Sequence, residues 1–313
     1  MPKFCRNASW NATSHIFATS KAENPIGIFV NLNNTVYVTS LNSAPVEMWF
    51  EGNSNAAQSV LSKFSGNLGV FVALNDDVYV NDGSKNEVFV WHRTSDKTVT
   101  VVKNDGQCYS LFLDINNTIY CSLWSLGKVT KQSLNMRRVD IGGLKNPLGI
   151  FVHTNFTLYV ADNGNDRIQR VFPGETTGIS VVGRGSSILP GLYRPTAVVL
   201  DADGYLFITD EEGHIYGSGP DGFRCLVQYF NPSKPERSTP GLRRLSFDSY
   251  GNIFATNADN NRILKFMLAT NSCGKYPNVW LKSIIENERI NRARVSLVIH
   301  HFFSAKSELL LLI

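Results

Sequence analysis

The sequence has no long apolar run. A helix that spans a membrane needs about eighteen consecutive apolar residues, and the most apolar segment, Ser296 to Phe303, is interrupted by His300 and His301. The first residues, Met1 to Trp10, also lack the apolar centre of a signal peptide. We therefore expect no transmembrane segment, and we expect the natural chain to begin upstream of Met1.

A strong charge of one sign is also missing. The net charge is +4 over 313 residues, and the segment after Cys273 carries +3 of it. The preceding part of the chain is nearly neutral, so it offers no basic surface for a phosphate backbone. This balance argues against a nucleic-acid partner.

Several motifs of enzymes and zinc modules are absent. The sequence contains no Gly-x-Ser-x-Gly, His-Glu-x-x-His or Cys-x-x-Cys pattern, the marks of α/β-hydrolases, zinc proteases and many structural zinc sites. Their absence argues against these classes and leaves open enzymes whose metal ligands are scattered along the chain.

What the sequence does contain is an internal repeat. Asn24 to Val30, NPIGIFV, matches Asn146 to Val152, NPLGIFV, almost letter for letter. With the glycine of this motif as the anchor, six equivalent positions follow one another after 42, 41, 39, 48 and 47 residues: Gly27, Gly69, Ser110, Gly149, Ala197 and Arg244. An aromatic residue stands ten positions after every anchor: Tyr37, Tyr79, Tyr120, Tyr159, Phe207 and Phe254. The constant offset indicates two strands joined by a turn of fixed geometry in each unit.

A third segment follows in every unit and a fourth closes it, so the sequence predicts an all-β, six-bladed β-propeller of four-stranded antiparallel blades. The sixth unit lacks a fourth strand, whereas residues 10–20 hold an unassigned strand, HIFAT. We expect this N-terminal strand to complete the last blade and close the ring. The propeller should cover residues 1–273, with repeats starting near 24, 66, 107, 146, 194 and 241. Residues 274–313 do not match the repeat, and both helix and disorder remain open for them.

The segments DNGNDRI, from Asp162 to Ile168, and NADNNRI, from Asn257 to Ile263, resemble the NHL repeat family. The resemblance covers roughly Asn24 to Phe266 and departs at Leu123, where an acid is expected, and in the shortened loop from Asp210 to His214. It implies a six-bladed propeller. It also implies several roles, because NHL-like proteins include lyases with an axial zinc site of several histidines, substrate-recognition parts of ubiquitin ligases, and RNA-binding heads.

Five cysteines allow two disulfides. Cys5 precedes the expected outer strand of the last blade and Cys273 follows the third strand of that blade, so antiparallel pairing would bring them to one end of the sheet. Cys108 and Cys121 flank the first hairpin of the third unit and should lie within about two residue pairs of each other. Cys225 is left over. Five reduced and buried thiols are the alternative interpretation.

Asn-x-Ser/Thr sequons, which accept N-glycans in the secretory pathway, occur at Asn7, Asn11, Asn33, Asn116 and Asn155. The last three stand six residues after their anchors, on the turn between the first and second strands. Asn also suits such a turn for backbone reasons, which is the structural alternative. We predict glycosylation, an extracellular or secretory location, and a glycan-shielded face of the disc.

The opposite face should carry the residues that precede each first strand. They form an expected ligand-binding collar around the channel: Asn24, Asn67, Gln107, Asn146 and Arg194, followed by the backbone of Gly241. Four amides and one guanidinium suit a polar peptide or a carboxylate, although such residues also cap strands and meet only water.

A second set of polar residues stands thirteen positions after the anchors: Asp82, Asp162, Asp210 and Asn257. Converging carboxylates suit Ca²⁺, but an acid in such a loop also satisfies backbone amides or pairs with the next arginine, as Asp162 would with Arg167. We interpret these residues as structural. No cofactor and no metal site are predicted, with Ca²⁺ left open, and the histidines fall at repeat positions too different to share one axial site.

The sequence therefore predicts a secreted or cell-surface NHL propeller that acts as a binding scaffold for a protein, peptide or glycan on the face opposite the sequons. One alternative is a propeller enzyme, either a metal-dependent lyase or a lactonase-like hydrolase. The other is the substrate-recognition propeller of a ubiquitin-ligase-type adaptor.

Overall fold

The computed structural model describes residues 1–5, 8–21, 23–41, 45–53, 58–61, 66, 68–133, 136–189, 191–229 and 241–269. All of them belong to one compact unit, Met1–Ser272. The 274–313 extension lies outside the described residues, as do Asn7, Asn67 and Cys273. Within the described ranges, no helix has the length and apolar character that a membrane crossing requires.

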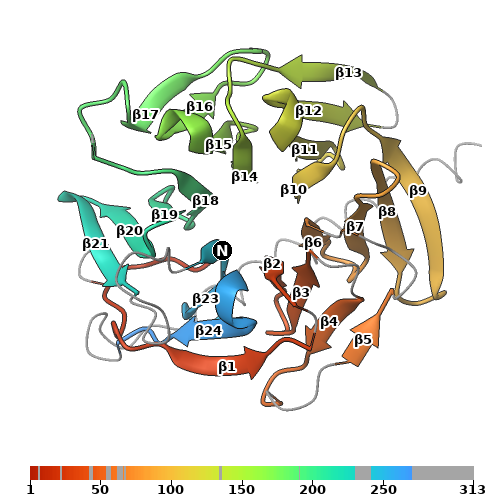
Figure 1. Ribbon diagram of the computed structural model, residues 1–313, viewed down its shortest axis with the longest axis horizontal. Coiled ribbons are helices and arrows are strands. Elements are labelled where there is room, and N and C mark those ends of the chain that lie inside the picture. The colour runs from red at the N-terminus through yellow and green to blue at the C-terminus, as the bar shows by residue number, and fades with distance from the viewer. Residues whose placement is uncertain are drawn as a thin grey trace, which may run out of the picture. The chain divides into compact units, whose positions relative to one another are not determined.

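The described residues form six four-stranded antiparallel sheets arranged as the blades of a propeller (Figure 1), which confirms the predicted fold. Each sheet is a meander whose first strand is innermost. Blades 1 to 3 comprise β2 (Pro25–Val30), β3 (Val36–Ser40), β4 (Val46–Trp49) and β5 (Gln58–Val60); β6 (Val70–Val72), β7 (Val78–Asp82), β8 (Glu87–His92) and β9 (Lys97–Lys103); and β10 (Cys108–Leu113), β11 (Ile119–Leu123), β12 (Lys128–Ser133) and β13 (Met136–Ile141). Blades 4 to 6 comprise β14 (Pro147–Val152), β15 (Leu158–Asp162), β16 (Arg167–Val171) and β17 (Ile179–Gly183); β18 (Pro195–Leu200), β19 (Leu206–Asp210), β20 (His214–Gly219) and β21 (Gly222–Gln228); and β22 (Leu242–Phe247), β23 (Ile253–Asn257), β24 (Arg262–Phe266) and β1 (His15–Thr19).

The N-terminal strand closes the ring, as predicted. Strand β1 pairs antiparallel with β24, from His15 opposite Lys265 to Thr19 opposite Arg262. This exchange makes the first part of the chain the outer strand of the last blade, so the two ends of the propeller are held together.

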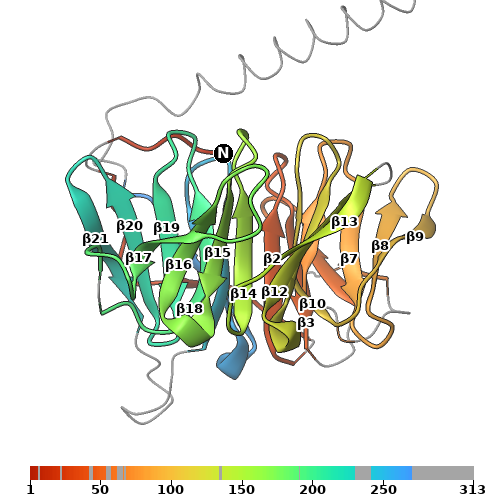
Figure 2. The ribbon, with the colours of Figure 1, turned by 90° about the horizontal axis from the view of Figure 1, so that it is seen from above.

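Strand direction gives the disc two distinct faces, visible at the two rims of the side view in Figure 2. We call the face with the turns between first and second strands the turn face. The other, the collar face, carries the loops between second and third strands and the segments that lead into each first strand. In blades 3, 4 and 6 the collar-face loop is a short 3-10 turn: η1 (Trp124–Leu126), η2 (Asn163–Asn165) and η3 (Ala258–Asn260).

Small anchor residues allow neighbouring blades to approach closely. A Cβ atom added to Gly27 would lie 2.6 Å from the Leu68 carbonyl oxygen, and one added to Gly149 would lie 2.6 Å from the Ala197 Cα. Real Cβ atoms do not approach this closely, so the glycines are required by the packing of first strand against first strand.

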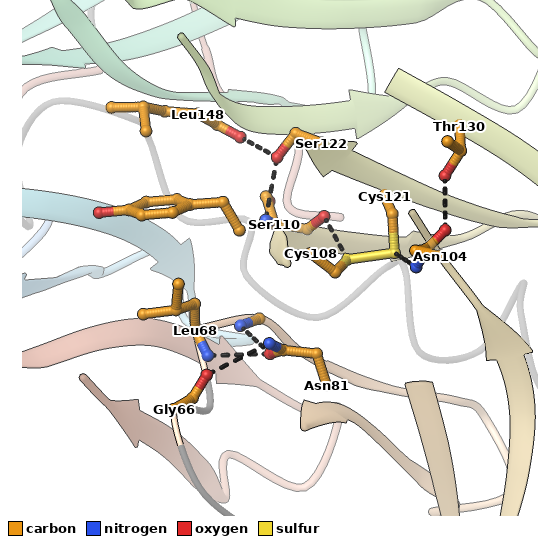
Figure 3. Close-up of a disulfide and its surroundings, with 12 residues drawn as sticks. Gly66, Leu68, Asn81, Asn104, Cys108, Ser110, Cys121, Ser122, Thr130 and Leu148 are labelled. Atoms are coloured by element: carbon orange, nitrogen blue, oxygen red, sulfur yellow. Dashed lines mark hydrogen bonds between the residues drawn. A yellow bond between two sulfur atoms is a disulfide. The ribbon is translucent and has the colours of Figure 1, made fainter. Parts of the chain in front are cut away.

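A column of residues twelve positions after the anchors is polar in five of the six blades, and two of its hydroxyls link one blade to the next. Ser122 accepts a hydrogen bond from the Ser110 amide (2.9 Å) and donates one to the Leu148 carbonyl of the next blade (2.7 Å), as Figure 3 shows. Thr256 does the same between the Arg244 amide and the Ile26 carbonyl, so blade 6 is joined to blade 1. Sequence analysis missed this column: Thr39, Asn81, Ser122, Ala161, Thr209 and Thr256.

The core lies between the blades. Four phenylalanines of successive first strands, Phe29, Phe71, Phe112 and Phe151, pack in series with ring centroids 5.0 to 5.1 Å apart and ring planes inclined by 58° to 60°. Each packs with the apolar residues of adjoining sheets, in a geometry that aromatic rings favour. This rigid body fixes the positions of both sets of loops.

Candidate functional site

The collar residues adopt a conformation that explains their type. Asn24, Asn146 and Arg194 have φ angles of 56°, 49° and 43°, and Gly241 has 73°. Asn and Gly reach this left-handed region at low cost, and Arg does so with strain. Asparagine is therefore favoured at positions 24 and 146 for backbone reasons, independently of any ligand.

Their side chains remain accessible on the collar face. The side chains of Asn24 and Asn146 form no hydrogen bond with any described residue, and both residues are partly exposed. Arg194 is 46% exposed in its side chain, and its guanidinium lies 3.1 Å from Glu211. Gln107 is the exception, because its amide donates to the Gly66 carbonyl at 3.1 Å. The structure thus leaves the amides of Asn24 and Asn146 unpaired among the described residues and presents the Arg194 guanidinium, half exposed and paired with Glu211, beside them.

Large exposed side chains accompany them, and sequence analysis missed these. Trp124 and Leu126 in η1 are each 45% exposed, and Tyr193, directly before Arg194, is 44% exposed. Trp, Tyr and Arg are the residue types that dominate the binding energy of protein interfaces. The sequence signal was the Leu123-Trp124 pair, because every other blade has an acid or a small polar residue at the position of Leu123 and none has an aromatic residue at that of Trp124.

The loop acids are buried within hydrogen-bond networks. Asp162 accepts from the Lys145 amide at 2.7 Å, from Asn165 at 2.9 Å and from the Arg167 guanidinium at 2.7 Å. Asp82 accepts from Ser84 in the same way. These contacts hold the collar-face loops in place.

The acid of blade 5 has a different environment. Asp210 is fully buried and accepts from the His214 amide and from His214 Nδ1, both at 2.9 Å. Burial raises the pKa of the Asp210 carboxyl, and the hydrogen bonds from His214 oppose that shift. Glu212 completes a group whose ligand atoms lie within 4.8 Å of one another, the one such group among the described residues. One imidazole and two carboxylates suit a small divalent cation.

The axis of the propeller holds a buried cation. Arg244 of blade 6 is 7% exposed, and its Nη1 donates to the Thr196 carbonyl of blade 5 at 2.6 Å. Its Nη2 donates to the Tyr109 carbonyl of blade 3 at 3.3 Å. Blades 3 and 6 are separated by two blades on either side, so this side chain crosses the channel between them. Burial lowers the pKa of Arg244 to about 10.

The turn face carries the sequons and a further apolar set. Asn33, Asn116 and Asn155 are exposed, and so is Asn11. At the tips of the turns of blades 1 to 3, Leu32, Leu74 and Ile115 are 53%, 77% and 71% exposed, and Leu32 and Ile115 directly precede sequons. Both faces of the disc therefore present apolar side chains.

One of the two predicted disulfides is present among the described residues. Cys108 and Cys121 are bonded, with Cα atoms 5.2 Å apart (Figure 3). Cys225 is free and exposed. The Cys5–Cys273 bridge stays a prediction because Cys273 is outside the described residues.

Comparison with known proteins supports the fold and leaves the activity open. No protein-family model and no curated protein sequence matches the chain. Virginiamycin B lyase from Staphylococcus aureus is 12% identical, with a TM-score of 0.57 over 79% of this chain and 95% of that chain. A gluconolactonase from Xanthomonas campestris is 14% identical, with a TM-score of 0.61 over 80% and 88%.

A binding protein is equally similar. An auxiliary nutrient binding protein from Bacteroides ovatus is 14% identical, with a TM-score of 0.62 over 85% of this chain and 74% of that chain. Because lyases, lactonases and binding proteins share this architecture, the fold alone does not assign a role to the chain.

Proposed function

We propose that this chain is an NHL-type propeller of the secretory pathway or cell surface that binds a protein, peptide or glycan ligand on its collar face. The observation that carries the proposal is the exposure of Trp124, Tyr193 and Arg194 on that face, held by a rigid body. Aromatic and guanidinium groups on a preformed surface bind with little ordering cost.

The turn face is the competing binding surface. Its sequons favour attached N-glycans there over a bound protein partner. Leu32 and Ile115 stand directly before the sequon residues Asn33 and Asn116. A glycan on either asparagine would cover the apolar side chain beside it and block a protein partner there. A secretory location also fits the Cys108–Cys121 disulfide, since such bonds persist in oxidising compartments.

The test compares matched variants on the two faces. The chain is secreted from a eukaryotic host behind an added signal peptide and screened against arrays of secreted proteins, cell-surface ectodomains and glycans. For a ligand found in this way, Trp124→Ser and Arg194→Glu should each weaken binding about tenfold or more. Leu74→Ser, on the turn face, is the control and should leave the affinity unchanged. Loss of binding in Leu74→Ser with unchanged Trp124→Ser would refute the collar-face proposal.

A metal-dependent enzyme is the second candidate, favoured by the group of Asp210, Glu212 and His214. His214 Nδ1 lies 2.9 Å from Asp210 and 3.7 Å from Glu212, so all three side chains would hold the ion. A bound divalent cation would polarise a carbonyl or activate water. Metal analysis after purification without chelator tests this: one equivalent of Zn²⁺ or Ca²⁺ that is lost in His214→Ala favours the enzyme, and a metal-free chain favours the scaffold.

A further inference from the structure

A small cavity lies on the turn face of blade 5, under the N-terminal segment. Its volume is about 120 Å³, and its lining includes Phe4, Trp10, Asp201, Phe207 and Gly217. A cavity of about 10–15 Å³ admits one water, so this one admits a chain of several non-hydrogen atoms. The cavity is remote from the collar face, and what it binds is independent of the function proposed above.

The carboxylate at this cavity lacks a partner that its counterparts in other blades have. Asp201 is 2% exposed, and its Oδ1 accepts from the Asp203 and Tyr205 amides at 2.9 and 2.8 Å. Its Oδ2 is buried and accepts no hydrogen bond from a described residue. Burial raises the pKa of this carboxyl, and the Phe4 amide lies close enough to it to oppose that shift. A buried carboxylate oxygen without a donor is costly, so this atom marks a place where a donor is missing.

The repeat shows which donor is missing. In blade 3, the equivalent Asp114 accepts from the Tyr120 hydroxyl at 3.1 Å. In blade 6, the equivalent Asp248 accepts from Asn252 at 2.8 Å and lies 3.2 Å from the Lys265 ammonium. Blade 5 has neither arrangement. Phe207 stands where blade 3 has Tyr120, and blade 5 also lacks the lysine that pairs with the aspartate in blade 6.

A glycine in blade 5 takes the place of the lysine. Lys265 lies opposite Phe254 in the strand register, and Lys131 lies opposite Tyr120. Their ammonium groups lie over these rings, 4.8 and 5.4 Å from the centroids. The corresponding residue opposite Phe207 is Gly217. The cavity therefore occupies the region where two other blades hold a lysine over an aromatic ring, and where blade 6 also pairs that lysine with an aspartate.

The remaining walls suit the same group. Phe4 and Trp10 of the N-terminal segment lie 5.4 and 5.5 Å from the Phe207 ring, and aromatic faces attract ammonium ions. Two other charged side chains line the cavity, Asp221 and Arg224, and the Arg224 guanidinium already donates to the Ala8 carbonyl. Lys3 is paired with Asp203 at 2.8 Å.

We propose that this cavity binds a primary ammonium group on a short alkyl stem, placed over Phe207 and paired with Asp201 Oδ2. Such a group comes from a free alkylamine or from the lysine side chain of another protein. Both share the chemistry that Lys265 displays within blade 6.

The first experiment measures binding of n-butylammonium to the full chain by NMR titration, with n-butanol as the uncharged control. Butylammonium should bind about tenfold or more tightly than butanol, and Asp201→Asn should remove that difference. The Asn31 turn of blade 1 shows that asparagine supports the same turn through its Oδ1, so this variant keeps the fold. Equal affinity for the two ligands, or unchanged amine binding in Asp201→Asn, would overturn the proposal.

A second pair of variants tests the site without relying on Asp201. Gly217→Lys supplies a tethered ammonium and should abolish butylammonium binding while raising the melting temperature. Its added Cβ would meet only the flexible end of Leu226. Gly217→Met fills the same space without charge and should give a smaller rise. If Gly217→Lys still binds butylammonium, or is no more stable than Gly217→Met, the proposed pairing is wrong.

Two further binding measurements identify the source of the amine. Nα-acetyl-lysine methylamide that binds as well as butylammonium identifies a lysine side chain as the occupant; binding of butylammonium alone identifies a free amine. The amino group of Met1 also lies in the electrostatic field of Asp201, as does Lys3, which is paired with Asp203. Butylammonium should therefore bind the Nα-acetylated chain at least as tightly, and loss of binding there would contradict the proposal.

Discussion

The guanidinium of Arg244 lies 5.2 Å from the centroid of the Tyr109 ring, on the opposite side of the propeller axis. Among the described residues no carboxylate pairs with it, and its donors face main-chain carbonyls of blades 5 and 3. The cation therefore joins three inner strands through peptide dipoles and an aromatic face. Because it crosses the channel, a ligand would meet the protein on one face and would not pass through.

Replacing Arg244 tests this cross-axis contact. Arg244→Ala should lower the free energy of unfolding by about 3 kcal/mol or more, since it leaves a void and removes the donors of two buried carbonyls. Arg244→Met should cost less, because it fills the channel and removes a buried charge. Urea unfolding gives both values; an alanine variant as stable as the wild type would show that the contact contributes nothing.

Thr256 tests the link that closes the ring. The hydroxyl is buried between the Arg244 amide and the Ile26 carbonyl. Thr256→Val keeps the volume but leaves both groups unpaired, so we expect a loss of about 1–3 kcal/mol in chemical unfolding. Thr256→Ser retains the hydroxyl and should lose less than half as much. Equal losses would assign the effect to packing.

The Cys108–Cys121 disulfide should contribute about 3 kcal/mol, the value expected for a closed loop of this size. The double variant Cys108→Ser, Cys121→Ser should unfold at correspondingly lower urea concentration. Cys225→Ser, which removes a free thiol, is the matched control and should leave the midpoint unchanged. A double variant that matches this control would show that the bond is dispensable for stability.

Glycosylation of the turn face is open to direct measurement. Protein secreted from a eukaryotic host should lose mass on removal of N-glycans, and Asn→Gln changes at Asn33, Asn116 and Asn155 should each remove one glycan. The asparagines at all three sites are exposed. An unmodified chain, reduced at every cysteine, would contradict the secretory location and favour the intracellular adaptor.

Asp201 should make stability depend on pH. Burial raises its folded-state pKa, so the folded state binds the proton more tightly, and the free energy of unfolding falls as pH rises from the unfolded value of about 3.8 through the folded pKa. Asp201→Asn should therefore be more stable than the wild type at pH 7, by an amount that shrinks toward pH 3.5. Asp248→Asn is the control: it loses the pairing with Lys265 and should be less stable at pH 7.

Most of the fold could be predicted from the sequence repeat. Gly27 and Gly149 recur because first strands approach too closely for a Cβ, and the aromatic column recurs because it packs between blades, as Tyr37 and Tyr120 do. The local backbone conformation of the loops could be predicted equally well. The asparagines of the collar and the DNGND-type loops mark left-handed residues such as Asn146, Asp166 and Asn261.

The candidate site was only partly predictable. The collar positions followed from the repeat, but the exposure of Trp124 and Tyr193 did not, because an aromatic residue beside a strand is buried in some blades and exposed in others. The group of Asp210, Glu212 and His214 escaped notice because it depends on the shortened loop of one blade, whose geometry no other repeat shares.

The sequence by itself determined the six blades and the strand that closes the ring, because both follow from local periodicity and from pairing between adjacent strands. It also brought Cys108 and Cys121 near each other, and the structure decided between their bond and two reduced thiols. Only the tertiary structure decided which polar groups lack partners. Arg244 meets Tyr109, and Asp201 is left beside a cavity, because residues far apart in the chain come together across the axis and across blade 5. Such contacts depend on how volumes and charges fit in three dimensions, which no repeat pattern encodes.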